Sequence, residues 1–156
     1  MHNPTTPSIR QATLADLDNL SLLFDAYRQF YGRPPDLTLA RTFLLERFQQ
    51  DQSVLFIAFG LGGTTPVGFT QLYPSFSSLS AARIFILNDL YVVPQARRLG
   101  TGAGLLQAAA AYARTAGAVR LTLSTALDNR AAQALYTSQG WVRDEEFCVF
   151  NLSLKP

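Results

Sequence analysis

The order of elements between residues 84 and 125 constrains the fold most. Ile84–Val93 has the length and apolar character of a buried strand, and Pro94 ends it because proline lacks the amide that continues a strand ladder. A Gly-rich turn, an Ala-rich helix closed by Gly117 and a second apolar run, Val119–Thr125, follow. This order predicts a βαβ crossover, in which the two strands are parallel.

The first half of the chain predicts helices and a β-hairpin. Thr13 and Asp16 have the spacing of a capping box that opens a helix, and Leu37–Gln50 has the pattern of a second helix. Val54–Phe59 and Val67–Tyr73 are β-like runs separated by a segment rich in Gly and Thr, which favours antiparallel pairing. We therefore expect an α+β fold with a mixed, mostly antiparallel, twisted sheet flanked by helices.

Four further segments complete the predicted order. We expect a loop of small residues at Pro74–Ala82 and a short helix at Arg130–Gln139. Trp141–Arg143 and the β-like run Phe147–Leu154 are expected to be the last strands. Together with a short apolar entry at Ile9, these elements bring the expected sheet to about six to seven strands.

Composition limits the size and the partners of the protein. With 156 residues, 48% of them hydrophobic, residues 1–156 are expected to form a single domain, with Met1–Ser8 flexible. The net charge of +2 arises from interspersed charges, which argues against nucleic-acid and membrane partners. No apolar segment reaches the ~20 residues that span a bilayer. One cysteine, Cys148, excludes an internal disulfide and a Cys-based zinc cluster, so we expect no metal and a cytoplasmic location.

The turn Gln95–Gly104, with the sequence QARRLGTGAG, lies between a predicted strand and a predicted helix. Free amides and the helix dipole favour an anion there, so a phosphate site is expected. A P-loop needs Lys and Ser or Thr after the glycine, but Leu105 and Leu106 stand here. A dinucleotide fingerprint fits poorly, because the sixth position counted from Gly100 is again Leu105.

The remaining pattern, Arg-x-x-Gly-x-Gly, resembles the pyrophosphate-binding motif of the GNAT superfamily of N-acetyltransferases. Glycines allow close approach to a diphosphate, and arginines add charge-assisted donors. The resemblance implies that acetyl-CoA is bound by Arg97, Arg98, Leu99, Gly100, Thr101, Gly102 and Ala103. Taken alone, the same glycines are also compatible with a simple tight turn.

A second segment, Asn129–Trp141, matches the superfamily pattern Asn-x-x-Ala-x-x-Leu-Tyr-x-x-x-Gly-aromatic. In that family the residue at Tyr136 donates a proton to the departing coenzyme A thiolate, a step that a phenol can perform. Asn129 is expected to cap the helix and bind the pantetheine arm, and the small side chain of Ala132 is expected to keep this helix face thin. Packing is the alternative role for Tyr136. The two motifs cover about the last half of the chain, and the resemblance implies a GNAT-like sheet with a parallel central pair.

The strand before the turn is similar to the central strand of that family. The resemblance implies that Leu90, Tyr91 and Val92 hold pantetheine and the acetyl carbonyl, and that free amides stabilise an oxyanion where this strand parts from its neighbour. Spermidine/spermine acetyltransferases have a glutamate base where this chain has Asn88, so a carboxylate is absent at that position. Asn88 can position a water that relays the proton instead. Asp89 can attract a cationic amine, or it can have only a structural role in the strand. The run Asn88–Val92 is also similar to that of the histone/polyamine acetyltransferase group.

The resemblance therefore implies direct acetyl transfer from acetyl-CoA to a primary amine, through a tetrahedral intermediate. The acceptor can be a small amine, a polyamine, an amino acid, or a peptide or protein amine. The substrate candidates, by analogy with the family, are Tyr27, Tyr31, Asp36 and Glu145. Family members often dimerise through their last strands, so a homodimer is expected. The alternatives are a non-catalytic acyl-CoA-binding sensor or regulatory module, and a nucleotide-binding domain.

Overall fold

A computed structural model describes residues 6–155 of the chain. The chain forms two compact units, Met1–Ser124 and Thr125–Pro156, and each is described by itself. The expected flexibility of Met1–Ser8 concerns residues that lie largely outside the described part. Within that part, Ser8 already belongs to the first strand.

The first unit contains one mixed sheet. Its strands are β1 (Ser8–Gln11), β2 (Val54–Phe59), β3 (Pro66–Ser77), β4 (Ala82–Val92) and β5 (Leu121–Thr122). They follow one another in the order β1-β2-β3-β4-β5, with antiparallel neighbours from β1 to β4 and a parallel pair β4–β5. The mixed α+β fold and the βαβ crossover are confirmed. The described residues contain five strands, fewer than the six to seven expected, and β5 is the last strand of the order.

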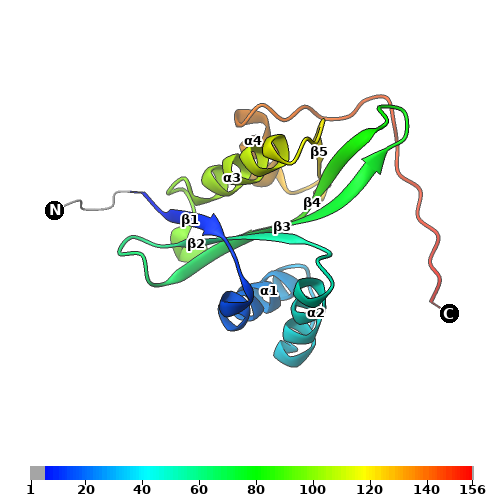
Figure 1. Cartoon of the computed structure of the whole chain (residues 1–156). Coiled ribbons are helices and arrows are strands. Elements are labelled where there is room, and N and C mark those ends of the chain that lie inside the picture. The colour runs from blue at the N-terminus through cyan, green and yellow to red at the C-terminus, as the bar shows by residue number, and fades with distance from the viewer. Residues whose placement is uncertain (1–5, 156) are drawn as a thin grey trace. The chain divides into compact units, whose positions relative to one another are not determined.

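Helices cover both faces of this sheet, as Figure 1 shows. One face carries α1 (Leu17–Phe30) and α2 (Leu37–Gln49), and the other carries α3 (Thr101–Thr115). Leu20, Leu44, Ile57 and Phe69 are fully buried between α1, α2 and the sheet. Leu105 is fully buried on the α3 side. Each such side chain contributes about 1.5–3 kcal/mol through burial.

The start of the helical layer follows the predicted capping box. Asp16 ends the short 3-10 helix η1 (Leu14–Asp16), and its Oδ2 accepts a hydrogen bond from the Thr13 amide at 2.9 Å. Arg10 on β1 donates to both carboxylate oxygens of Asp16 at 2.8 Å. This ion pair lowers the pKa of the Asp16 carboxyl, because the guanidinium stabilises its charged form. The ion pair therefore links β1 to the start of α1.

Strand β3 is longer than predicted, and the expected loop at Pro74–Ala82 was wrong for its first half. The pairing with β2 ends at Leu72, so β3 has a free edge beyond that residue. Pro74 is tolerated there because a missing amide leaves no ladder bond unmade on an unpaired edge. β3 therefore runs on to Ser77, paired with β4 alone.

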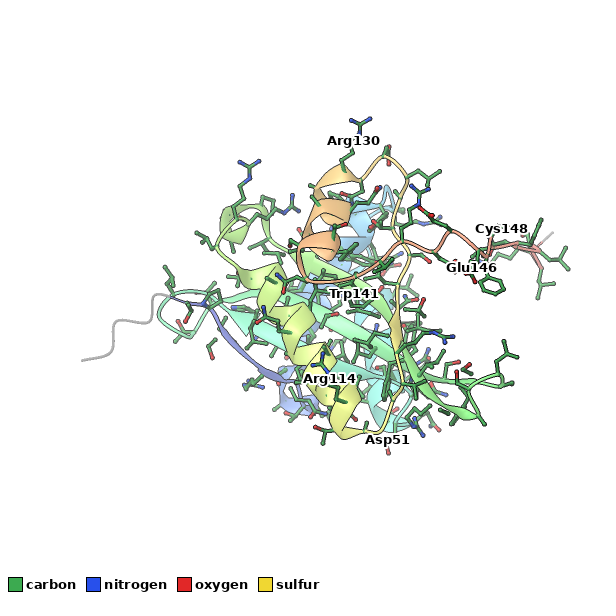
Figure 2. The ribbon with its side chains drawn as sticks, turned by 90° about the horizontal axis from the view of Figure 1, so that it is seen from above. Asp51, Arg114, Arg130, Trp141, Glu146 and Cys148 are labelled. Carbon is green, nitrogen blue, oxygen red and sulfur yellow. The ribbon has the colours of Figure 1, made fainter. Side chains whose placement is uncertain are left out.

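The second unit contains α4 (Arg130–Ser138) and extended chain. Asn129 caps α4 by accepting from the Ala132 amide at 3.2 Å, and Gly140, with φ +86°, follows the helix. The strands expected at Trp141–Arg143 and Phe147–Leu154 are absent from the described residues. Their β-like composition favoured strands, but this unit offers no neighbouring strand to pair with. Figure 2 shows Glu146 and Cys148 on this extended segment.

Candidate active site

Strand β4 contains a β-bulge at the position where the sequence analysis placed the reaction. Leu87 pairs with Leu72 and Asp89 pairs with Gln71 on β3, so Asn88 is an extra residue. Before the bulge, the Phe85 amide points away from β3 and donates to Arg120 at 3.2 Å. In a regular strand, successive residues point their backbone groups to opposite sides. The bulge shifts this alternation by one residue for the rest of β4.

After the bulge, the even-numbered residues of β4 turn their backbone groups away from β3. The amide of Val93, the residue after β4, donates to Val67 of β3 at 2.9 Å, so by alternation the backbone groups of Leu90 and Val92 face the opposite side. β5 pairs only with Phe85 and Ile86, and so leaves this edge unpaired. The strand expected at Val119–Thr125 is correspondingly short. The ladder between β4 and β5 ends at Ile86 and Thr122, which is compatible with the parting of the two strands that the family resemblance implied.

Tyr91 differs from its neighbours in orientation. Its backbone faces β3, where a side chain on Gly68 would come within 2.8 Å of the Tyr91 carbonyl oxygen. Its ring packs 6.5 Å from the ring of Tyr27 on α1. The Tyr91 ring thus packs on α1, and the edge that β5 leaves unpaired consists of the backbone groups of Leu90 and Val92.

The Gly-rich turn forms the start of α3. Gly100 adopts a left-handed conformation with φ +83°, which glycine tolerates without a steric cost. The Gly104 amide makes the first helical hydrogen bond, to Gly100 at 2.9 Å, so the amides of Thr101, Gly102 and Ala103 precede it. The Thr101 hydroxyl donates to Ala96 at 3.3 Å and anchors the turn. The helix start therefore presents amides to an anion.

The two arginines of this turn differ. Arg97 donates from Nε to the Val92 carbonyl at 2.9 Å, and its guanidinium lies over the rings of Phe30 and Tyr91 at 5.6 and 5.9 Å. Arg98 is exposed, has φ +61°, and makes no ion pair with another described residue. The guanidinium of Arg98 is thus available to a phosphate, and the terminal nitrogens of Arg97 remain further donors beside the Nε that Val92 engages. Leu99, between them and the helix, is 55% exposed.

A cavity of about 430 Å³ opens between α1, α2, β3 and β4 within the first unit. Its walls are mainly aromatic, formed by Phe24, Tyr27, Tyr31, Phe43 and Tyr73. Asn88 and Asp89, from the bulge of β4, also line it. The volume lies at the low end of the roughly 300–1,000 Å³ that is typical of small-molecule sites.

Asp89 is the buried carboxylate of this cavity and is only 4% exposed. Gln71 donates to Oδ2 at 2.7 Å and Asn88 donates to Oδ1 at 3.1 Å. Burial raises the pKa of the Asp89 carboxyl, although hydrogen bonds from Gln71, Tyr27 and Asn88 act in the opposite direction. A carboxylate with a raised pKa is a stronger proton acceptor than an exposed one.

Tyr73 faces the same cavity from β3. Burial, with a further contribution from the nearby Asp89 charge, raises the pKa of Tyr73 to about 12. The hydroxyl therefore stays protonated in the neutral pH range and can act there as a hydrogen-bond donor.

The predicted substrate residues do not all meet in this cavity. Tyr27 and Tyr31 line it, with ring centroids 5.1 Å apart. Asp36 instead caps α2 by accepting from the Leu39 amide at 2.9 Å. Glu145 is exposed in the second unit.

The sequence analysis did not identify several lining residues, namely Phe24, Arg28, Arg33, Leu39, Phe43 and Tyr73. A signal was present for two of them. Phe24 and Arg28 share helical spacing with Tyr27 and Tyr31, which places all four on one face of α1. Nothing in the sequence indicated that β3 would bring Tyr73 to the same cavity.

In the second unit, the segment Asn129–Trp141 forms a local structure of its own. The Trp141 amide donates to the Tyr136 carbonyl at 3.0 Å, and the two rings lie 6.1 Å apart. Asn129 and Ala132 are joined by the helix cap, so the cap predicted for Asn129 is confirmed. In Figure 2, Arg130 points outward from the first turn of this helix.

Comparison with known proteins decides the family. The profile of the acetyltransferase (GNAT) family matches residues 19–141. The chain belongs to this family. It is an N-acetyltransferase, as the sequence analysis predicted.

The similarity to individual GNAT relatives extends over nearly the whole chain. The uncharacterized N-acetyltransferase YhfO of Bacillus subtilis is 46% identical over 147 residues, which are 94% of this chain and 97% of the relative. A crystal structure of a "probable acetyltransferase" is 44% identical, with a TM-score of 0.89 over 96% of this chain and 99% of that chain. Aminoglycoside N(6')-acetyltransferase type 1 of Stenotrophomonas maltophilia is 28% identical over 97% of each chain.

Two observations concern other possible sites in residues 6–155. No helix in this range combines the length and the apolar character needed to cross a membrane. In the same range, no group of three or more His, Cys, Asp or Glu side chains is arranged to hold a metal ion.

Proposed function

We propose that this GNAT enzyme transfers the acetyl group of acetyl-CoA directly to a primary amine, and that the amine binds in the cavity that ends at Asp89. One observation carries the proposal. The cavity reaches Asp89, and the unpaired backbone edge of β4 begins at Leu90, the next residue. An amine held at Asp89 therefore lies beside backbone donors that suit a thioester carbonyl.

The donor side of the site fits acetyl-CoA, which would supply the acetyl group as a thioester. The amides of Thr101, Gly102 and Ala103 and the guanidinium of Arg98 suit its pyrophosphate. The backbone groups of Leu90 and the Val92 amide are unpaired by β5 and suit the pantetheine amides and the acetyl oxygen. These fixed groups orient the thioester and need no rearrangement during the reaction.

The acceptor side supplies a base and an aromatic wall. Asp89 accepts the proton that an ammonium must lose before its nitrogen can attack, directly or through a water held by Asn88. Aromatic faces such as those of Tyr27 and Tyr31 stabilise a cation before that proton leaves. No covalent intermediate on the enzyme is needed, and Cys148 is exposed in the extended segment of the second unit.

We propose that Tyr136 donates a proton to the departing thiolate, and that Asn129 and Ala132 bind the pantetheine arm. The proposal is supported by the match of Asn129–Trp141 to the GNAT pattern, not by a measured distance to the other site residues. It includes the single domain expected from the sequence, since the family profile spans residues 19–141 of both units.

The test is thiol release from acetyl-CoA on a panel of primary amines. We expect wild-type turnover and a loss of about 100-fold in kcat for Tyr136→Phe, as for removal of a general acid. Tyr112→Phe is the matched control, because Tyr112 of α3 packs on the rings of Phe56 and Phe85 of the sheet. Unchanged turnover of Tyr136→Phe would remove this proton donor.

Thiol release together with thermal unfolding distinguishes the two alternatives. A non-catalytic acyl-CoA sensor would be protected from thermal unfolding by coenzyme A but would give no thiol release with any amine of the panel. A nucleotide-binding domain would be protected by ATP or NAD and not by coenzyme A.

Two wider expectations belong to the proposal. A cytoplasmic location is supported by the single cysteine, which is a free thiol. A homodimer is supported by the apolar side chains exposed in residues 147–154, which include Phe147, Val149, Phe150, Leu152 and Leu154. A monomer in sedimentation at assay concentrations would contradict the dimer.

A further inference from the structure

The cavity contains one positive charge without a partner. Arg28, Arg33 and Asp89 are its charged lining residues. Arg28 donates to Asp25 at 3.3 Å, and so its charge is compensated. Arg33 forms no ion pair and no side-chain hydrogen bond with any of residues 6–155.

The backbone of Arg33 is held firmly although its side chain is exposed. Gly32, with φ +79°, ends α1 by donating to Gln29 at 2.9 Å, and the Arg33 amide donates to Arg28 at 3.0 Å. This is the double hydrogen bond of a Schellman motif. The residue at this place in the motif is frequently apolar and packs back on the helix, whereas here it is a charged residue at a cavity.

The next turn of the loop is anchored by the same acid that holds Arg28. Asp25 accepts from the Asp36 amide at 3.0 Å and from the Gln29 side chain at 3.1 Å. Pro34 and Pro35 lie between and restrict the backbone. The loop therefore presents the Arg33 guanidinium from a fixed base.

We propose that the acceptor amine carries an oxyanion, a carboxylate or a phosphate-type group, and that Arg33 binds this group while Asp89 binds the amine. This inference rests on the proposed function and narrows its acceptor class to small molecules with both charges. A planar guanidinium pairs with carboxylate or phosphate oxygens through two parallel hydrogen bonds. The aromatic side chains that line the same cavity suit the carbon chain of the acceptor.

The same charges disfavour a polycationic acceptor. A second ammonium on the acceptor would meet Arg33 and would have no described acid of the cavity lining other than Asp89 to bind it. The alternative role of Arg33 is purely structural, because a cation after the last turn of α1 interacts favourably with the helix dipole. That role would affect stability and not acceptor preference.

The experiment compares acceptors that differ only at the end remote from the amine. Thiol release is measured with γ-aminobutyrate, butylamine and putrescine, and aminopropylphosphonate distinguishes a phosphate-type group from a carboxylate. We expect kcat/KM to be about tenfold higher for the better of the two anionic amines than for butylamine, and lowest for putrescine. Arg33→Glu should reverse this order, and Arg33→Lys should keep it in weakened form. Arg41→Gln is the matched control, because Arg41 pairs with Asp18 outside the cavity lining.

Each result decides one claim. Equal kcat/KM for the acceptors, unchanged by Arg33→Glu, would overturn the inference and leave the acetyltransferase proposal standing. A lower stability of Arg33→Glu with an unchanged acceptor order would assign Arg33 to the helix end and also overturn it. No thiol release from any of the amines with the wild type would contradict the proposed function, and the inference with it.

Discussion

Two buried aspartates of the first unit should separate stability from activity. Asp16 is 6% exposed and Asp89 is 4% exposed, but their pKa values move in opposite directions. Arg10 lowers the pKa of Asp16, whereas burial raises the pKa of Asp89. Replacing each by asparagine removes one negative charge and little volume. We expect Asp16→Asn to lose stability and Asp89→Asn to lose activity.

The sign of each stability effect follows from linkage. Asp16 has a folded pKa below its ordinary value of 3.8, so its ion pair stabilises the fold above that pH and is lost as the pH falls through the folded pKa. Asp89 has a folded pKa above 3.8, so its contribution to stability decreases as the pH rises from 3.8 through the folded value. Above its folded pKa, the charged Asp89 is therefore a cost to the fold.

The magnitudes follow from the contacts. Asp16→Asn weakens the double hydrogen bond from the half-exposed Arg10 and should lower the free energy of unfolding by about 1–2 kcal/mol. Asp89→Asn should change it by less than about 1 kcal/mol, because Gln71 can turn its amide and accept from the new side chain. The Gln71 Oε1 atom is buried and has no hydrogen-bond partner among the described residues. Loss of the base should lower kcat/KM by at least about 100-fold, or about 2.7 kcal/mol.

The assay is urea unfolding at neutral pH for both variants, together with thiol release on the best amine of the panel. We expect Asp16→Asn to keep kcat/KM within about twofold of the wild type, since no atom of Asp16 lines the cavity. An Asp89→Asn variant that loses more than about 2 kcal/mol of stability and keeps its kcat/KM would assign Asp89 to the strand's structure and refute the reasoning.

Three further outcomes can be checked. Tyr73 should be titrated near pH 12 in an alkaline absorbance titration, and Tyr73→Phe should remove that step. Gly68→Ala should lower the free energy of unfolding by about 1–3 kcal/mol in urea unfolding, because its Cβ would lie 2.8 Å from the Tyr91 carbonyl oxygen. Arg98→Gln should raise KM for acetyl-CoA about tenfold and leave kcat within about twofold, since one charge-assisted contact to a phosphate is lost far from the reacting atoms.

Local patterns predicted the parts of the fold that local contacts determine. Thr13 and Asp16 form the predicted capping box, and Gly100 takes the left-handed turn before α3. The length of β3 was not predictable in this way, because Pro74 is tolerated only where β2 has already ended. For Phe147–Leu154, in contrast, the local pattern predicted a strand that does not form. A β-like segment supplies no partner strand for its hydrogen bonds.

The candidate site was predictable in its motifs and not in its cavity. Asn88 and Asp89 were identified because they precede the Gly-rich turn, and both line the cavity. Arg33 and Tyr73 were not identified, since a helix end and a strand far apart in sequence meet there only in the folded chain. The pairing of Gln71 with Asp89 likewise depends on the register between β3 and β4.

The bulge at Asn88 explains why the acid and the free backbone edge occur together. Phe85, before the bulge, packs on Tyr112 of α3, whereas Tyr91, after it, packs on Tyr27 of α1. Both residues have odd numbers, so a regular strand would place them on one face. One extra residue therefore moves Asp89 to the face of the cavity and turns the backbone groups of Leu90 and Val92 away from β3. A single irregularity thus sets both the acceptor side and the donor side of the proposed reaction.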